Sequence, residues 1–310
     1  MYWGCVKIIR GNRKQPAPSC RQNITWLWYC KRCSLAALAY STLLGIPATA
    51  FANASPECPA SNTIPVDKSM DKKLVIIIDD LGNNRRRGEA ALTLPGKLTY
   101  AVIPHTRYSK LLAEEAHQRG KEVMLHAPMS TLEDAPLGTG GLNPDLSRED
   151  FLDTLRTSLE QVPHVQGINN HMGSDLTERR KQMAWLMQEL RWNNLYFVDS
   201  RTTGKTVAAT VASEFNVPNL SRHVFLDNTR TREAIDERFQ ALLARAEKHG
   251  IAVAIGHPYP ETVDYLLEAL PLLPELGMEL VFASEALQTE AAIKLAQIDT
   301  DLTASADPGC

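Results

Sequence analysis

The stretch LVIIIDDLG, from Leu74 to Gly82, decides the fold that this sequence predicts. Five apolar residues, four of them β-branched, run directly into two acids, a pattern typical of a buried parallel strand that ends at a polar edge. A dinucleotide-binding turn after such a strand is rich in glycine, whereas the turn from Asp79 to Asn84 holds one glycine and two acids. The stretch therefore favours a closed barrel over an open, nucleotide-binding sheet.

Short apolar runs alternate with amphipathic helical stretches through the rest of the chain. We expect strands near residues 74–78, 98–103, 122–125, 166–168, 195–198, 224–226, 251–255 and 280–283. We expect helices near residues 85–92, 108–119, 148–161, 177–191, 207–215, 232–249 and 260–270. Ser147 followed by Asp150 resembles a capping box at the start of one helix. This alternation predicts an α/β fold, a parallel (β/α) barrel covered by helices.

Residues 1–52 predict a signal peptide with an extended basic leader. They hold seven of the 33 Lys and Arg and no Asp or Glu, and an apolar run follows from Ser34 to Phe51. The small-x-small pattern that ends at Ala52 suits signal peptidase, so we expect export to the periplasm or beyond the cell. An uncleaved anchor is the alternative, but a span needs about 20 apolar residues and this run holds Gly45 and Pro47.

The remaining chain divides into a linker rich in Pro, Ser and Asn (53–71), the barrel domain (72–290) and a tail (291–310). It keeps 26 Lys and Arg against 36 Asp and Glu, a net charge of −10 that disfavours nucleic acid and anionic lipid as partners. Four of the six cysteines lie in the leader, so the Cys30-x-x-Cys33 pair is read as incidental. Cys58 and Cys310 remain, and they can pair or stay free.

Polar clusters follow the predicted strands at the edge where a β/α barrel carries its active site. Asp79 and Asp80 end the first strand, and both can serve one site only if the chain bends just after Ile78, which Gly82 would permit. A helix N-cap plus a solvated acid is the alternative. Adjacent acids at the mouth of an apolar core need a cation or protons.

Three of the eight histidines, His126, His171 and His257, also stand at strand ends, and with the two acids they match zinc-type coordination. Each alone is also compatible with a structural role. The fifth strand adds Asp199, which could orient a ligand histidine or pair with Arg201. Asp227 follows the sixth strand and is read as a helix cap outside the core site. Solvated roles are expected for the other histidines, at positions 105, 117, 164, 223 and 249.

The longest irregular stretch, residues 128–144, follows the third strand. Loops of this length are often lids or binding loops, so it is the candidate substrate-facing loop. A disordered insertion is the alternative.

Five motifs in order resemble the divergent polysaccharide deacetylase, YibQ-like, family: IIIDDLG (76–82), LHAPM (125–129), GINNHMGS (167–174), FVDSRT (197–202) and AIGHP (254–258). The resemblance implies a NodB-like distorted barrel in which Asp80, His126 and His171 bind a divalent metal, with zinc as the expected ion. It further implies Asp79 as general base and His257 as general acid. Asn170, Asp199 and Arg201 would support this site.

The sequence departs from the usual deacetylase pattern where catalysis would depend on it. Ordinary members carry two metal histidines four residues apart, but Ser130 stands four residues after His126, and GINNHMGS replaces an expected Arg-x-Pro-aromatic segment. The leading hypothesis is an exported metal-dependent hydrolase that deacetylates an envelope or extracellular polysaccharide. The alternative is an inactive envelope protein that binds glycan or a protein partner.

A metal-dependent phosphoesterase is the third candidate, because acid-histidine sites also suit phosphate esters. Against it, Arg201 and the run from Arg85 to Arg87 are the only cations expected near the rim.

Overall fold

The computed structural model describes residues 72–288, and the predicted leader, linker and tail, with all six cysteines, lie outside them. The strands are β1 (Lys72–Leu81), β2 (Thr99–Val102), β3 (Glu122–Met129), β4 (Val165–Met172), β5 (Tyr196–Asp199), β6 (Asn219–Ser221), β7 (Val224–Phe225), β8 (Ile251–Gly256) and β9 (Met278–Leu280). The helices are α1 (Arg85–Ala91), α2 (Ser109–Gln118), α3 (Arg148–Gln161), α4 (Arg180–Trp192), α5 (Ala208–Glu214), α6 (Arg232–His249) and α7 (Pro260–Ala269). Short 3₁₀ turns lie at Leu176–Glu178, Leu270–Leu272 and Pro274–Leu276.

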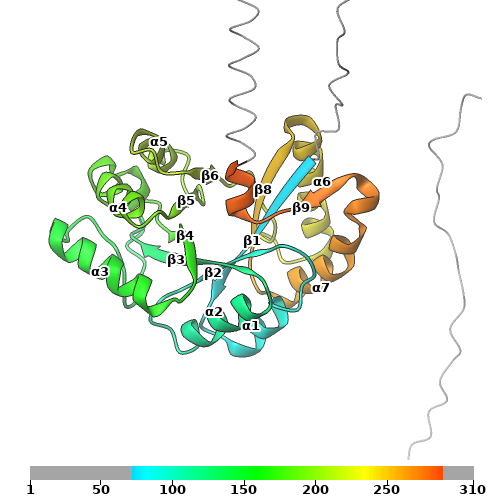
Figure 1. The fold of residues 1–310 in the computed structure, drawn as a ribbon, viewed down its shortest axis with the longest axis horizontal. Helices are drawn as coiled ribbons and strands as arrows, with labels where there is room; N and C mark the ends of the chain where they lie inside the picture. Colours follow the sequence, from blue (N-terminus) through cyan, green and yellow to red (C-terminus); the bar gives the residue numbers. More distant parts are fainter. Residues whose placement is uncertain (1–71, 289–310) are drawn as a thin grey trace, which may run out of the picture. The chain divides into compact units, whose positions relative to one another are not determined.

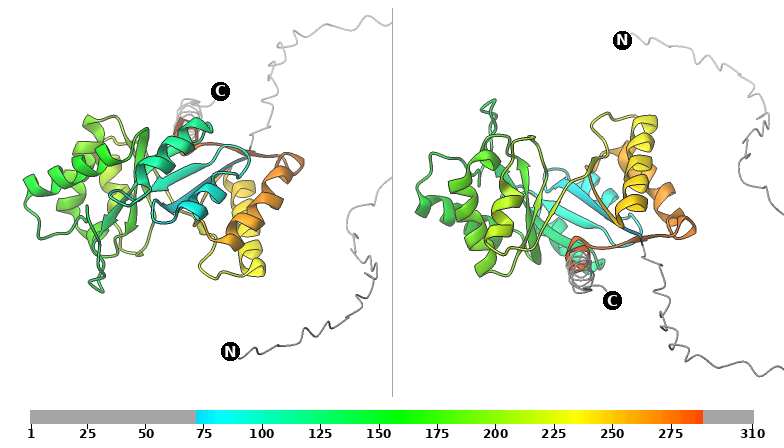
Figure 2. Two further views of the ribbon diagram at one scale, coloured as in Figure 1. Left: turned by 90° about the horizontal axis from the view of Figure 1, so that it is seen from below. Right: turned by 90° about the horizontal axis from the view of Figure 1, so that it is seen from above.

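All the paired strands of this domain are parallel, in the order β6-β5-β4-β3-β2-β1-β8-β7, with β9 beside the start of β1 (Figure 1). The helices lie around the strands: α3 and α4 stand on one side, and α6 and α7 on the opposite side, in both views of Figure 2. Helices α3 and α6 have the predicted limits, and Ser147 caps α3 by accepting a hydrogen bond from the Asp150 amide. The predicted parallel α/β barrel is confirmed.

Side chains along β1 alternate between two apolar clusters, as the two-residue period of a strand requires. Leu74, Ile76 and Ile78 pack into the larger cluster beneath the helices. Val75 and Ile77 pack into a smaller cluster, which also takes residues from β2, β3, β5, β6 and β8. The smaller cluster is the interior of the barrel. Gly167 of β4 leaves room there for the Tyr196 ring, because a Cβ at this position would lie 2.3 Å from it.

One extended stretch, Asn219–Phe225, joins the two edges of the sheet, and we call it the seam. Its first half, β6, pairs with β5, and its second half, β7, pairs with β8. The change of partner falls between Arg222, whose amide donates to the Asp199 carbonyl, and His223, whose amide donates to the Val253 carbonyl. Strand β6 was not predicted, because three residues of mixed polarity carry too little periodicity.

Two expectations are wrong. His223 is not a solvated histidine: its Nδ1 accepts a hydrogen bond from the Val253 amide at 3.0 Å, and burial lowers its pKa to about 4. The last strand is Met278–Leu280 rather than residues 280–283, and residues 283–288 are helical. Val281, Ala283 and Ala286 are apolar because they fill the barrel interior.

Candidate functional site

Strand alternation places the side chains of three predicted site residues at the mouth of the barrel. Ile77 of β1, Met124 of β3 and Ile255 of β8 face the interior. Two residues further along the chain stand Asp79, His126 and His257. The polar side chains therefore continue the inward-facing rows where the apolar residues stop, at the carboxyl ends of the parallel strands.

A bulge brings Asp80 to the same mouth, although simple alternation would turn it outward. The pairing of β1 with β2 shifts register between Ile78 and Leu81, and Asp80 has a φ of 62°, in the left-handed region. Gly82 follows with a φ of 125°, and a Cβ on it would meet the Thr106 hydroxyl at 2.2 Å. The predicted bend after Ile78 is confirmed.

The alternative reading of the two acids is wrong. Helix α1 is capped by the side chain of Asn84, which accepts a hydrogen bond from the Arg87 amide. Asp79 is 3% exposed, so it is not a solvated acid.

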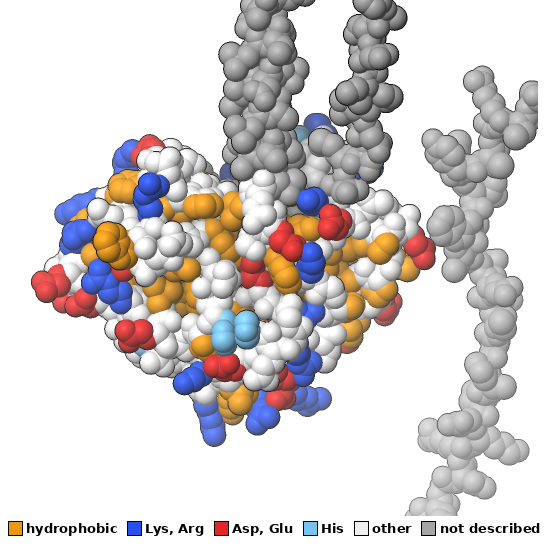
Figure 3. All heavy atoms as spheres, viewed as in Figure 1, with side chains coloured by type: hydrophobic (Ala, Val, Ile, Leu, Met, Phe, Trp, Pro, Cys, Tyr) orange, Lys and Arg blue, Asp and Glu red, His pale blue; other side chains and the backbone are white. Residues whose placement is uncertain are grey.

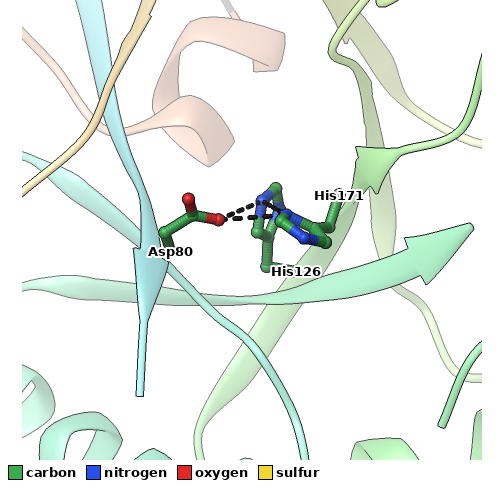
Figure 4. A group of neighbouring side chains, drawn as sticks. All are labelled: Asp80, His126 and His171. Atoms are coloured by element: carbon green, nitrogen blue, oxygen red, sulfur yellow. Dashed lines mark hydrogen bonds and ion pairs between the residues drawn. The ribbon is translucent and has the colours of Figure 1, made fainter. Parts of the chain in front are cut away.

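Three predicted metal ligands converge (Figure 4). Oδ1 of Asp80 lies 3.0 Å from Nδ1 of His171 and 3.3 Å from Nε2 of His126, and the two histidine nitrogens are 3.1 Å apart. The side chains come from β1, β3 and β4. We call Asp80, His126 and His171 the triad cluster.

Asn169 determines which nitrogen of His126 is available. A carboxylate only accepts hydrogen bonds, so the Asn169 amide nitrogen must be the group that donates to Oδ1 of Asp79 at 2.8 Å. The Asn169 oxygen then faces Nδ1 of His126 at 2.7 Å and requires a proton on that nitrogen. In the neutral imidazole, Nε2 consequently carries the lone pair and faces Asp80.

The triad cluster fits a divalent metal by its donor chemistry. Oδ1 of Asp80 is buried and receives no hydrogen bond, although it faces two imidazole nitrogens. One carboxylate oxygen and two imidazole nitrogens are a donor set that zinc accepts, and three protein ligands are usual where a fourth position serves catalysis. Within residues 72–288, this is the one group of three such side chains close enough to share an ion.

Charges in the cluster shift the pKa values in opposite directions. Burial opposes ionisation of Asp80, but the nearby imidazoles of His126 and His171 outweigh it and hold the Asp80 pKa well below its usual range. Burial also opposes protonation of His126, yet Asp79 and Asp80 outweigh it and raise the His126 pKa to about 9. For Asp79, burial dominates and raises the pKa.

His257 is oriented by Asp227, which was predicted to be a helix cap. Asp227 accepts hydrogen bonds from Nδ1 of His257 at 2.9 Å and from its backbone amide at 2.6 Å, while the Thr262 hydroxyl donates to Oδ2 at 2.8 Å. The cap of α6 is Thr231 instead. Burial opposes protonation of His257, but the hydrogen bond and charge of Asp227 raise its pKa.

Nε2 of His257 points toward the triad cluster, 3.8 Å from Oδ2 of Asp80. Two aromatic rings, those of Phe225 and Tyr259, contact the His257 ring, each with its centroid 5.3 Å away. Hydrogen bonds and ring contacts thus hold this imidazole in one orientation.

Of the three residues predicted to support the site, Asn170 and Asp199 bind loops instead of the triad cluster. Asn170 donates to the Met172 carbonyl and accepts from the Ser200 amide. Asp199 accepts from the Arg201 amide and the Thr206 hydroxyl, so its contacts are neither with a ligand histidine nor with the Arg201 guanidinium. These contacts shape the turns after β4 and β5.

The predicted substrate-facing loop begins within β3 and returns to it. Leu142 is buried and exchanges backbone hydrogen bonds with Pro128 and Ser130. The Ser130 hydroxyl donates to Asp175 at 2.8 Å, so the Ser130 side chain binds the loop after β4. His171, from the neighbouring strand, occupies the third place in the cluster. The binding role of the loop stays a prediction.

Sequence reasoning missed Asn169 and Asp227. Asn169 stands two residues before His171 on β4, so strand alternation alone would have placed it on the same face. Asp227 directly follows a short apolar run, as Asp79 and Asp199 do. Strand alternation was sufficient to include Asn169, and the position after an apolar run was sufficient to include Asp227.

Comparison with known proteins relates this geometry to a family. The family model described as divergent polysaccharide deacetylase matches residues 76–287, more than half of the chain. The chain belongs to the divergent polysaccharide deacetylase family. All members of the candidate site, from Asp79 to His257, lie within the matched stretch.

Two relatives of this divergent polysaccharide deacetylase family member are uncharacterised proteins. One, from Haemophilus influenzae, is 37% identical over 203 residues, which cover 66% of this chain and 72% of the relative. The other, YibQ of Escherichia coli, is 37% identical over 215 residues, which cover 69% of this chain and 67% of the relative.

The uncharacterised protein ATU2773 from Agrobacterium tumefaciens C58 has a similar solved structure, with a TM-score of 0.67 at 18% identity. The match covers 69% of this chain and 88% of that one. This likeness shows the fold alone, a barrel of parallel strands surrounded by helices, as predicted from the sequence.

Proposed function

We propose that this protein is an exported, metal-dependent hydrolase that removes acetyl groups from a polysaccharide of the cell envelope or its surroundings. The observation that carries the proposal is the convergence of Asp80, His126 and His171, with Asp79 and His257 beside them. The basic, then apolar, residues 1–52 support export to the periplasm or beyond. Among residues 72–288, no helix is long and apolar enough to span a membrane.

The triad cluster would hold the metal, with zinc as the ion that its donor set favours. A divalent ion held there supplies a Lewis acid for the acetyl carbonyl and lowers the pKa of a water molecule. Oδ1 of Asp79 accepts the hydrogen bond from Asn169, whereas Oδ2 of Asp79 faces the site and lies 3.6 Å from Nε2 of His126. The raised pKa of Asp79 suits a base that takes the proton of the attacking water.

His257 would act as the general acid. As the bond between the acyl carbon and the leaving nitrogen or oxygen breaks, Nε2 of His257 transfers its proton to the leaving atom, and acetate departs. Asp227 supports this role, because its carboxylate holds Nδ1 and favours the protonated ring before the transfer.

Acetate release tests this proposal directly. We expect the zinc-loaded protein to release acetate from acetylated oligosaccharides, and Asp79→Asn to lower the rate by about a hundredfold or more, because the base is lost. The variant should keep its metal and should melt at the same temperature or higher, since an amide avoids the cost of burying the Asp79 charge. Asp264→Asn, on the exposed face of α7, is the matched control. Stoichiometric metal without acetate release from N- or O-acetylated glycans would refute the proposal.

A non-catalytic glycan-binding protein is the second candidate, and the observation that favours it is Ser130. This residue stands where ordinary deacetylases carry a second metal histidine, and here it bonds Asp175. Such a protein would bind metal and glycan in the same experiment, and Asp79→Asn would change neither binding nor acetate release.

A further inference from the structure

A hollow of about 630 Å³ adjoins the candidate active site at the carboxyl ends of β5 and β7. Three guanidinium groups line it, those of Arg201, Arg222 and Arg238, against the single carboxylate of Glu237. Phe225 and Asn228 also line the hollow. We call it the arginine hollow.

The fold assembles these arginines from three separate elements. Arg201 follows β5, Arg222 belongs to the seam, and Arg238 lies in the second turn of α6. The expectation that Arg201 and the run from Arg85 to Arg87 are the only cations near the rim is therefore wrong. It failed because the seam, which carries Arg222, was not recognised as part of the barrel.

Within residues 72–288, the arginines of the hollow form no direct ion pairs with neighbouring side chains, although the charges of Asp79 and Asp199 reach Arg222. In the part of the chain that the structure describes, no salt bridge joins Arg201, Arg222 or Arg238 to a carboxylate. Some other arginines are paired with carboxylates, as Arg180 is with Glu214 and Arg232 with Glu268. On the face drawn in Figure 3, basic and acidic side chains likewise lie among one another.

Neutral acceptors hold Arg222 in place. Its Nε donates to the Ser200 carbonyl at 2.6 Å and its Nη2 to the Arg201 carbonyl at 2.8 Å. These bonds fix the guanidinium group without cancelling its charge, so the group is prepared to meet an anion.

The arginine hollow and the candidate acid share a wall. The Arg222 guanidinium lies 4.9 Å from the centroid of the Phe225 ring, and that ring lies 5.3 Å from the ring of His257. A group bound in the hollow is thus separated from His257 by a single aromatic side chain.

We propose that the arginine hollow binds an anionic group, a carboxylate or a phosphate, carried by the glycan whose acetylated sugar lies between Asp79 and His257. Guanidinium groups recognise both anions through paired N–H donors. The substrate is accordingly an acidic glycan. That a glycan carries the anion rests on the proposed function, whereas binding of an anion in the arginine hollow does not.

Calorimetric titration with matched oligosaccharides tests the proposal without any need for turnover. The first pair is a tetrasaccharide of alternating N-acetylglucosamine and glucuronate, and the same molecule with its carboxylates reduced to alcohols. The second pair is N-acetylglucosamine tetrasaccharide with and without 6-phosphates. We expect one charged member to bind about tenfold more tightly than its neutral partner, and the pair that shows the difference identifies the anion.

Arginine variants locate the effect. Arg201→Gln with Arg238→Gln should remove about the same tenfold preference and leave the affinity for the neutral oligosaccharide unchanged. Arg245→Gln, two turns further along α6, removes an exposed arginine from the same helix and should keep the preference. An equal loss in Arg245→Gln, or equal binding or no binding of charged and neutral forms, would overturn the proposal.

Acetate release, measured on the same four oligosaccharides, separates this inference from the proposed function. Equal release from charged and neutral forms keeps the hydrolase and refutes the acidic substrate. Arginine-dependent binding without acetate release keeps the anion site and refutes the hydrolase.

Discussion

At the level of single residues, the amide of Asn169 joins the proposed base to a proposed metal ligand. It donates to Asp79 and accepts from His126, so one side chain orients both. Ligand histidines are commonly held in this way by a group that binds their second ring nitrogen, and loss of such a group typically lowers metal affinity or activity.

Asn169→Ala should weaken zinc binding about 10- to 100-fold, because the His126 ring loses the contact that keeps its Nε2 toward Asp80. Competition with a chelating dye at constant pH measures the change. Asn193→Ala is the control, since this amide bonds Glu189 at the end of α4. An affinity equal to that of the wild type would show that the orientation of His126 does not depend on Asn169.

Asp227→Asn should reduce acetate release by about a hundredfold or more, because His257 loses the carboxylate that orients it and raises its pKa. Thr262→Val removes one hydroxyl donor to Asp227 and leaves its charge, so this variant should lose far less activity. Rates are compared at equal metal occupancy. Similar losses in the two variants would indicate that local packing, rather than the charge of Asp227, matters.

At the level of elements, strand β1 explains how neighbouring acids reach one site. Alternation along the strand and the acids at its end are visible in the sequence, and together they predicted a bend after Ile78. The bulge itself could not be located from the residues, because the left-handed conformation of Asp80 depends on pairing with β2, which is distant in sequence.

The seam was less predictable for a physical reason. Its two strands have three and two residues, and each pairs on only one side. Its conformation is set by β5 and β8, which lie on either side, and local pattern carries little of that information. His223 illustrates the point, because nothing in its sequence neighbours reveals that it bonds Val253.

His223 should make the stability of the seam depend on pH. Its folded pKa is about 4, below the unfolded value of about 6.5, so as pH falls the unfolded chain takes up this proton first. Stability is therefore lost between about pH 6.5 and about pH 4.

Urea unfolding at pH 7 and pH 5 measures this effect. We expect the wild type to lose on the order of 1 kcal/mol more than His223→Gln, after allowance for the partial exposure of His223. His105→Gln, at a histidine that contacts Ser158, should behave as the wild type does. Parallel losses in the wild type and His223→Gln would contradict the assignment.

At the level of the whole molecule, the parallel barrel and the side of it that carries the site were predictable, because both follow from repeated local patterns. Asp79, His126 and His257 each extend an inward-facing row of apolar residues. What remained hidden depended on contacts between distant segments: the pairing of Asp227 with His257, and the meeting of Arg201, Arg222 and Arg238 in one hollow.

The seam also has an evolutionary consequence. Both edges of the sheet end within one continuous stretch, so residues inserted between Ser221 and Val224 would widen the mouth of the barrel without shifting the register of β1, β3 or β4. Changes of length at this single point would therefore alter the size of accepted ligands while the acids and histidines kept their spacing.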